Sequence, residues 1–317
     1  MSTPELVTME SFAHAETAHY FTEQLAKAPV NGYYHNREPV TVENQEIIRS
    51  NVDLIYSYAV VDVTQEATFS LAPSQEYQIA QVIDENHYVP GVVYPGETLT
   101  VHHSDLTIGT HVYILGRTAT TGGLDRAHEL QDLRRIQAAT ANPYVPPSYD
   151  QDSLVAMRKQ IEARAAEADY SKGFGTPATT TPLQHALAAE LGWGGLPPQH
   201  AQYFQAKTVS TGCDAWTFPV PPLDYEHSGY FSVIKYTDSG WLDVQRPGLS
   251  DNEITRNADG TITIWFGDQR CQGKPNLIET TEGQTFYYGI RLYRPRDVDQ
   301  TRAYIDTLRT NPIQPGA

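Results

Sequence analysis

The feature that most constrains the fold is the segment from Asn51 to Val63, which reads as one long strand. Side chains along a strand alternate between its two faces. One face carries Asp53, Ile55, Ser57, Ala59, Val61 and Val63, and the other carries Leu54, Tyr56, Tyr58, Val60 and Asp62. Neither face is freely polar, so we expect other parts of the protein to cover both of them. The segment therefore predicts the middle of a β-sandwich.

A dense group of polar residues follows the next predicted strand, which runs from Tyr77 to Ile83. This loop reads Asp84-Glu85-Asn86-His87-Tyr88 and is bounded by Pro90-Gly91. A histidine beside a carboxylate has a pKa suited to proton transfer near neutral pH. Two carboxylates and an imidazole are also ligands that divalent metals accept in proteins. The sequence therefore predicts either an acid/base site or a metal site in this loop.

The candidate residues follow from these two interpretations. The catalytic candidates are Asp84 and His87 from the loop, with Asp53 and Tyr56 from the central strand. The metal-ligand candidates are Asp84, Glu85 and His87. The structural alternative is that Asp84 and Asn86 cap a turn while His87 stacks on Tyr88. For Asp53, a structural role in binding loop amides is weighed equally with a catalytic one.

Composition limits the function classes. The chain has 317 residues, enough for two domains, and its 20 Tyr, 21 Pro and 22 Gly favour β-structure with many turns. The formal net charge of −16 argues against nucleic acid and anionic membranes as partners. We expect a small-molecule ligand, and leave a homo-oligomer open. Residues 1–25 show no secretory leader, which favours a cytoplasmic protein.

A proline-rich segment, Asn142 to Pro147, divides the predicted organisation. Apolar periodicity predicts helices at about 11–27, 124–140 and 151–168, with Leu130 and Leu133 of the second helix towards the core. The predicted parts are a β-sandwich domain at 1–141, a helical connector at 142–200 and a jelly-roll-like domain at 201–317. The predicted fold class is mainly β with α connectors, and the C-terminal domain is an antiparallel jelly roll.

The C-terminal part is read as β because its apolar residues alternate. Ile262, Ile264 and Phe266 share one face of a strand, and so do Phe286, Tyr288, Ile290 and Leu292. On the opposite face of the second strand, Arg291 and Tyr293 are candidates for binding an anionic substrate group, together with Tyr88 from the N-terminal loop. The alternative is that Arg291 and Tyr293 hold the two domains together.

Several common catalytic and cofactor-binding motifs are absent from the sequence. The sequence has no GxxxxGK[ST], GxGxxG after a strand, GxSxG, HExxH or CxxC motif, so no organic cofactor is expected. Ser232 and Lys235 have the spacing of a nucleophile and its base, but a strand directs them to opposite faces. Cys213 and Cys271 are interpreted as buried thiols, with a disulfide as the alternative.

The order of motifs resembles a two-domain family. The N-terminal part is similar to DUF1254 in Asn51-x-Asp53-x-x-Tyr56-Ser57, Asp62 and Gln81-Val82-Ile83. The C-terminal part is similar to its companion DUF1214 in Tyr230 to Gly240, Ala258-Asp259-Gly260-Thr261 and Arg291-Leu292-Tyr293-Arg294-Pro295. The resemblance implies a sandwich, a helical connector and a jelly-roll-like domain, and assigns no catalytic residue. Asn276 stands where some relatives have a second cysteine, which excludes a local disulfide there.

Two functions compete. The first is an enzyme that performs hydrolytic or lyase-type acid/base chemistry on a small polar molecule, in the N-terminal sandwich or in a cleft between the domains. The second is a non-catalytic protein that binds a ligand, a glycan or another protein, as sandwiches and jelly rolls often do. The concentration of polar residues at strand ends favours the enzyme.

Overall fold

The computed structural model describes residues 3–45 and 49–316, which form two compact units. The N-terminal unit comprises Met1–Arg37, Tyr56–Thr118 and Asp125–Pro198. The C-terminal unit comprises Glu38–Ile55, Ala119–Leu124 and Gln199–Ala317. The segments Glu38–Ile55 and Ala119–Leu124 thus belong to the C-terminal unit, and most of the predicted helical connector belongs to the N-terminal unit. This division differs from the three consecutive parts predicted from the sequence. No helix within 3–45 or 49–316 has the length and apolar character needed to cross a membrane.

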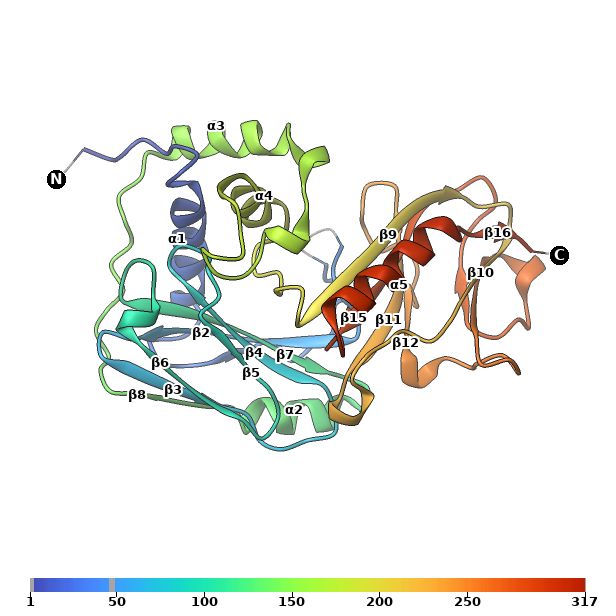
Figure 1. Cartoon of the computed structure of the whole chain (residues 1–317), viewed down its shortest axis with the longest axis horizontal. Helices are drawn as coiled ribbons and strands as arrows, with labels where there is room; N and C mark the ends of the chain where they lie inside the picture. Colours follow the sequence, from blue (N-terminus) through green and yellow to red (C-terminus); the bar gives the residue numbers. More distant parts are fainter. Residues whose placement is uncertain (1–2, 46–48, 317) are drawn as a thin grey trace. The chain divides into compact units, whose positions relative to one another are not determined.

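The N-terminal unit is a sandwich of two sheets (Figure 1). The larger sheet has the order β1-β2-β7-β4-β5, and the smaller has the order β6-β3-β8. Its strands are β1 (Tyr34–His35), β2 (Leu54–Asp62), β3 (Glu66–Ser70), β4 (Gln78–Asp84), β5 (Gly91–Val93), β6 (Thr98–His102), β7 (His111–Ala119) and β8 (Arg135–Ala138). The predicted central strand is therefore β2, although β7 lies between it and β4.

Both faces of β2 are covered, as its sequence predicts. Ala59, Val61 and Val63 face Phe69 of β3 in the core between the two sheets. Val60, on the other face, packs in a cluster with Phe21 of the first helix. The apolar character of both faces therefore has two causes, since a second sheet covers one side and helices cover the other.

Helices α1 (Phe12–Leu25), α3 (Gln151–Glu162) and α4 (Pro182–Gly192) share one core and lie on the same side of the large sheet (Figure 1). Asp150 caps α3 by accepting a hydrogen bond from the Ser153 amide at 2.8 Å. Thr181 caps α4, and Pro182 is the first residue of this helix. The prediction of a helix to residue 168 was wrong, because α3 ends at Glu162 and a separate 3₁₀ turn, Ala165–Glu167, follows.

The second predicted helix was also too long. Helix α2 covers Leu124–Asp132 only, and β8 begins at Arg135. Between them the buried Arg134 guanidinium donates to the Arg117 carbonyl and to Thr118 Oγ1, each at 2.8 Å. This turn inwards ends the helix and leaves Leu133 43% exposed, so its predicted core position was wrong.

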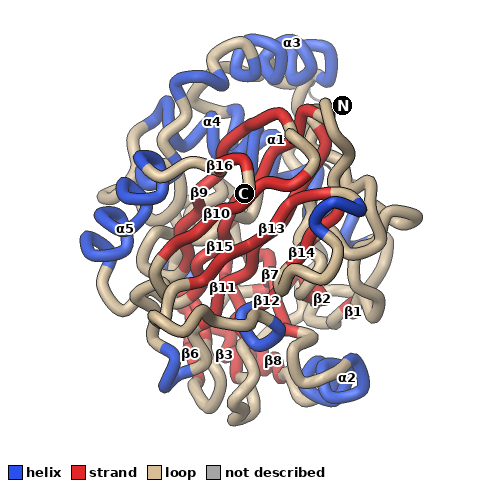
Figure 2. Tube along the Cα trace, turned by 90° about the vertical axis from the view of Figure 1, so that its right-hand side faces the viewer, coloured by secondary structure: helices blue, strands red, loops and turns tan. Residues whose placement is uncertain are grey.

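The C-terminal unit contains two four-stranded sheets around one core (Figure 2). Their orders are β12-β11-β15-β9 and β14-β13-β10-β16. The elements are β9 (Ala201–Val209), β10 (Cys213–Phe218), β11 (Tyr230–Thr237), β12 (Gly248–Ser250), β13 (Ile262–Gly267), β14 (Leu277–Glu279), β15 (Thr285–Tyr293), α5 (Val298–Thr310) and β16 (Gln314–Pro315). The residues predicted to alternate inwards on β13 and β15 are buried in this core, against which α5 also packs. The protein is thus mainly β, as predicted.

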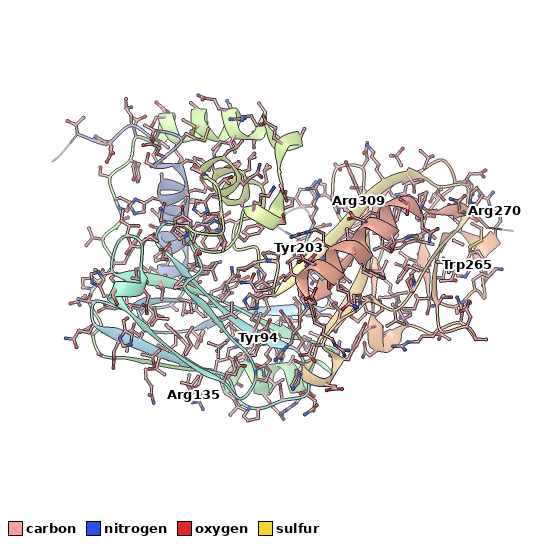
Figure 3. All side chains as sticks on the ribbon, in the orientation of Figure 1. Tyr94, Arg135, Tyr203, Trp265, Arg270 and Arg309 are labelled. Carbon is pink, nitrogen blue, oxygen red and sulfur yellow. A yellow bond between two sulfur atoms is a disulfide. The ribbon has the colours of Figure 1, made fainter. Side chains whose placement is uncertain are left out.

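The two cysteines form a disulfide rather than two thiols. Cys213 on β10 is bonded to Cys271, which follows β13 in a 3₁₀ turn, across 58 positions of sequence. The preference for free thiols was wrong because sequence separation says nothing about the approach of β10 and the turn. In the same region Arg270 pairs with Asp268 at 2.7 Å and Glu282 at 3.0 Å, outside the core (Figure 3).

Candidate functional site

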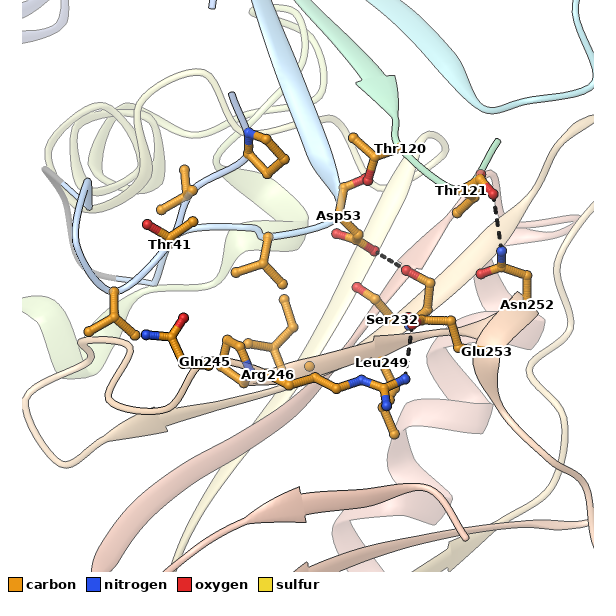
Figure 4. A pocket seen from close by; sticks show the side chains of 18 of the residues that line it. Thr41, Asp53, Thr120, Thr121, Ser232, Gln245, Arg246, Leu249, Asn252 and Glu253 are labelled. Carbon is orange, nitrogen blue, oxygen red and sulfur yellow. Dashed lines mark hydrogen bonds and ion pairs between the residues drawn. The ribbon is translucent and has the colours of Figure 1, made fainter. Parts of the chain in front are cut away.

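A pocket of about 510 Å³ lies in the C-terminal unit (Figure 4). We call it the Asp53 pocket. Its lining residues are Pro39, Val40, Thr41, Val42, Val52, Asp53, Thr120, Thr121, Gly123, Ser232, Ile234, Gln245, Arg246, Pro247, Gly248, Leu249, Ser250, Asn252 and Glu253. Its volume is in the range of small-molecule sites in proteins.

The chain holds Asp53 in place through its backbone. The amide of Asp53 donates to Asn51 Oδ1 at 3.2 Å, and its carbonyl accepts from the amide of Thr120 at 3.0 Å. Asn51 is itself fixed, because its side-chain amide donates to the Tyr293 hydroxyl at 2.6 Å. Asp53 is therefore positioned by β15 and by the segment after β7, and it lines the pocket.

The Asp53 carboxyl is the most unusual group in the lining. It is buried, with an exposed fraction of 7%, and its Oδ2 accepts a hydrogen bond from Ser250 Oγ at 3.0 Å. Its Oδ1 is buried and has no hydrogen-bond partner among the residues that the structure describes. Burial raises the pKa of Asp53, while the charge of Arg291 and the hydroxyls of Ser250 and Ser232 limit the rise.

The rest of the lining divides into polar and apolar walls. Arg246 and Glu253 form an ion pair at 2.9 Å, and Glu253 also accepts from the Ser250 amide at 3.0 Å (Figure 4). Asn252 donates to the Thr121 carbonyl at 3.3 Å. The apolar wall consists of Pro39, Val40, Val42, Val52, Ile234, Pro247 and Leu249. The pocket thus offers both hydrocarbon surface and hydrogen-bonding groups.

Arg291 and Tyr293 lie near Asp53 but are not part of the lining. The Arg291 guanidinium donates to the Arg49 carbonyl and, at 2.7 Å, to the Tyr236 hydroxyl. These contacts fix the Glu38–Ile55 segment to the strands of its own unit. A role for Arg291 and Tyr293 in binding substrate remains a prediction.

A second carboxyl stands beside the pocket. Burial raises the pKa of Asp251 to about 6, and the negative charge of Asp53 contributes to the rise. Asp251 begins the 3₁₀ turn Asp251–Glu253, directly after Ser250. The Ser250-x-x-Glu253 spacing is a capping box, and it fixes this turn, of which Asn252 and Glu253 line the pocket.

The acidic loop lies in the N-terminal unit, and its side chains turn to different partners. Asp84 accepts four hydrogen bonds of 2.6–2.9 Å, from the amides of Asn86, Tyr88 and Thr107 and from Thr107 Oγ1. Glu85 accepts from the amides of Thr110 and His111 at 2.8 and 2.9 Å. These bonds tie the loop after β4 to the loop before β7.

His87 is buried against the segment that follows α4. Its Nε2 accepts the Gly194 amide at 2.9 Å, and its ring stacks on Trp193 at a centroid distance of 5.4 Å. Burial holds the pKa of His87 well below its ordinary value. Tyr88 stacks on His185 rather than on His87, with ring centroids 4.1 Å apart. The structure therefore does not bring Asp84 and His87 together as a pair.

Tyr56 and the metal candidates complete the predicted set. Tyr56 is half-buried on β2, where it packs in the Phe21 cluster of the N-terminal unit. No three His, Cys, Asp or Glu side chains within the described ranges converge as metal ligands, and Asp84, Glu85 and His87 do not. A catalytic role for Tyr56, Asp84 or His87 stays a prediction.

Sequence reasoning identified Asp53 but missed the two serines beside it. Ser232 is buried on β11, and Lys235 on the same strand pairs with Asp243 at 2.7 Å. The prediction that Ser232 and Lys235 do not act as a nucleophile and its base agrees with this geometry. That prediction also removed Ser232 from the candidate site residues. For Ser250 the only signal was the capping-box spacing.

Among known protein families, one matches part of the C-terminal unit. Residues 219–297 match the family described as a protein of unknown function, DUF1214. The chain is similar in structure to the VPA0106 protein from Vibrio parahaemolyticus, with 16% identity and a TM-score of 0.72 over 98% of both chains. It is also similar to an uncharacterised protein from Burkholderia cenocepacia, with 15% identity and a TM-score of 0.52 over 91% of this chain and 84% of that one. No curated protein sequence matches the chain.

Proposed function

We propose that the protein is an enzyme that performs acid/base chemistry on a small polar molecule in the Asp53 pocket. The observation that carries the proposal is a buried carboxyl with a raised pKa at the wall of a pocket, with one oxygen left without a partner. Perturbed carboxyls in concave sites are a common property of catalytic acids and bases. The proposed site lies in the C-terminal unit and includes Asp53, one of the candidates from the sequence, whereas the sequence predicted a site in the N-terminal sandwich or in a cleft between the domains.

The neighbouring groups support proton transfer by Asp53. Ser250 donates to Oδ2 and so orients the carboxyl, while the buried Oδ1 has no partner of ordinary hydrogen-bond length among the described residues. A raised pKa brings the carboxyl closer to neutral pH, where an acid/base catalyst is most effective. The nearby Asp251, with its pKa raised to about 6, adds a second carboxyl that can exchange protons.

The experiment is a substrate panel applied to the parent protein and to Asp53→Asn. Small esters, lactones, amides and hydroxy acids, each with and without a primary amino group, are incubated with each protein, and products are followed by NMR. General acid/base groups contribute about 100-fold or more, so turnover of any converted compound should fall by about that factor in Asp53→Asn. Asp299→Asn is the matched control, because the Asp299 side chain is 88% exposed on α5. Equal rates in parent and Asp53→Asn, or no conversion of any compound by the parent, would overturn the proposal.

We also propose that the N-terminal unit is the DUF1254 companion of the matched DUF1214 region. The support is the set of motifs around Asn51, Asp53 and Asp62, together with a structural similarity that extends over nearly the whole chain rather than over the matched region alone. A profile search with sequences related to the segment 51–88 tests this. Its failure to connect them to DUF1254 would remove the proposal.

A further inference from the structure

The charges that line the Asp53 pocket leave one carboxylate uncompensated. Asp53, Arg246 and Glu253 are the ionisable side chains in the lining, and Arg246 and Glu253 neutralise each other in their ion pair. Two further charged groups influence Asp53 from behind the lining, and they have opposite signs: Arg291 on β15 and Asp251 after β12. With Asp53 ionised, the inner wall therefore favours a positively charged ligand.

The hydrogen-bonding groups of this wall favour the same kind of ligand. Asp53 Oδ1 and Ser232 Oγ are both buried and have no hydrogen-bond partner of ordinary length in the described part of the chain, although the Ser232 hydroxyl lies close enough to the Asp53 carboxyl to interact with it. Both residues line the pocket, and Ser232 is close enough to lower the pKa of Asp53. An ammonium group carries three N–H donors and no acceptor, so it can satisfy both oxygens at once. A ligand carboxylate would place a second negative charge against Asp53.

The remainder of the pocket fits a hydrocarbon body. Val40, Val42 and Val52 pack against the Ile234 cluster and form a continuous apolar wall beside Asp53. Burial of a hydrocarbon group on this wall adds affinity of about 25 cal/mol per Å² of apolar area, reduced by the cost of association. A ligand with one charged end and one apolar end would use both halves of the lining.

We propose that the Asp53 pocket takes a small primary amine, bound as its ammonium ion with its N–H donors on Asp53 Oδ1 and Ser232 Oγ. This names the substrate class of the proposed function and rests on it for its catalytic meaning. The binding itself does not depend on catalysis, so the two claims are tested separately.

The test uses three probes of nearly equal shape and different charge: phenethylamine, phenethyl alcohol and phenylacetate. Calorimetric titration of the parent protein should show phenethylamine binding about tenfold or more tightly than phenethyl alcohol, with phenylacetate weakest. Asp53→Asn should lose about tenfold in amine affinity and keep its affinity for the alcohol, and Ser232→Ala should show a smaller loss. Asp299→Asn should bind all three probes as the parent does.

The pH dependence has a defined sign. Amine binding requires ionised Asp53, so affinity should rise with pH through the raised pKa of Asp53 and fall about tenfold per unit below it. The same titrations should show proton release on binding in that range. Because Asp251 titrates nearby, Asp251→Asn is included, and it should shift this dependence without removing it.

The outcomes separate the two claims. Equal affinity for amine and alcohol, absence of amine binding, or unchanged amine binding in Asp53→Asn overturns the inference. If Asp53→Asn nevertheless loses turnover of a neutral compound, the proposed function stands alone. Amine preference that depends on Asp53, with no conversion of any compound, instead supports the ligand class and refutes the enzyme.

Discussion

Removal of the Cys213–Cys271 disulfide should lower the stability of the C-terminal unit by an amount set by the loop that it closes. The bond joins positions 58 residues apart, and the chain-entropy relation for a loop of that length gives about 14 cal/mol/K, or about 4 kcal/mol at 25 °C. That loss is comparable with the whole stability of many domains. The bond also joins the start of β10 to the turn after β13, and these are the two middle strands of one sheet.

The assay is urea unfolding, followed by circular dichroism and by tryptophan fluorescence, with and without reductant. Trp216 is a useful reporter because it lies fully buried on β10 in the core of this unit. The free energy of unfolding of the parent should fall by about 4 kcal/mol with reductant present. The double variant Cys213→Ala, Cys271→Ala should match the reduced parent and should not respond to reductant.

Cys271 is fully buried, and its sulfur lies 2.8 Å from the position that a Gly267 side chain would occupy. Reduction should therefore be slow in the folded state and fast in denaturant, so samples are equilibrated in urea before measurement. Two titratable thiols in unreduced, denatured protein would refute the bond itself. An unchanged midpoint after verified reduction would refute the loop-entropy argument.

Three further predictions concern the N-terminal unit. His87→Ala should lower the free energy of unfolding by about 1–3 kcal/mol because the Gly194 amide loses its acceptor; a parent-like melting temperature would leave the catalytic hypothesis for His87 standing. Asp62→Ala should cost about 1–3 kcal/mol in urea unfolding, since amides that include that of Asn142 lose their acceptor; no change would show that solvent replaces it. Burial, with the charge of Glu16, raises the pKa of Glu190 to about 7, so parental stability should fall as pH rises from about 4.5 to 7, while Glu190→Gln should lose less over that range. If the melting temperatures of the parent and of Glu190→Gln change equally from pH 5 to 8, this last expectation is wrong.

Local periodicity was sufficient to predict several elements and one key site residue. The two-sided apolar pattern of β2 and the alternation in β13 and β15 depend on neighbouring residues in the chain, and each was predicted. The placement of β7 between β2 and β4, the turn inwards at Arg134 and the approach of Cys213 to Cys271 depend on tertiary pairing. No local pattern encodes those.

The candidate site shows the same division. Asp53 could be selected because a carboxylate at the start of a buried strand needs a partner or a function. The acidic loop was predicted as a site because it has several ionisable residues close together in the sequence. In the structure its carboxylates accept hydrogen bonds from backbone amides. Ser232 and Ser250 come from strands about 180 and 200 residues after Asp53, and only the folded chain places them beside it.

A comparison of two substitutions at Asp53 separates a structural role from a functional one. Burial raises the pKa of Asp53, so the folded protein favours the protonated form, and stability should decline as pH rises from the ordinary carboxyl pKa through the raised one. Asp53→Asn keeps an oxygen for the Ser250 hydroxyl and removes that penalty, so above the raised pKa it should be at least as stable as the parent. Asp53→Ala leaves Ser250 without its acceptor and should be less stable than Asp53→Asn by about 1–3 kcal/mol.

A buried carboxyl that lowers the free energy of unfolding at neutral pH, when an amide of the same shape would not, is expected at a position where activity requires the carboxyl. Urea unfolding of parent, Asp53→Asn and Asp53→Ala from pH 4 to 8 measures the three free energies directly. If Asp53→Asn is less stable than the parent at every pH, the carboxylate is held by partners that prefer its charge. Asp53 would then have a structural role in the segment before β2, and the main support for acid/base chemistry in the pocket would be removed.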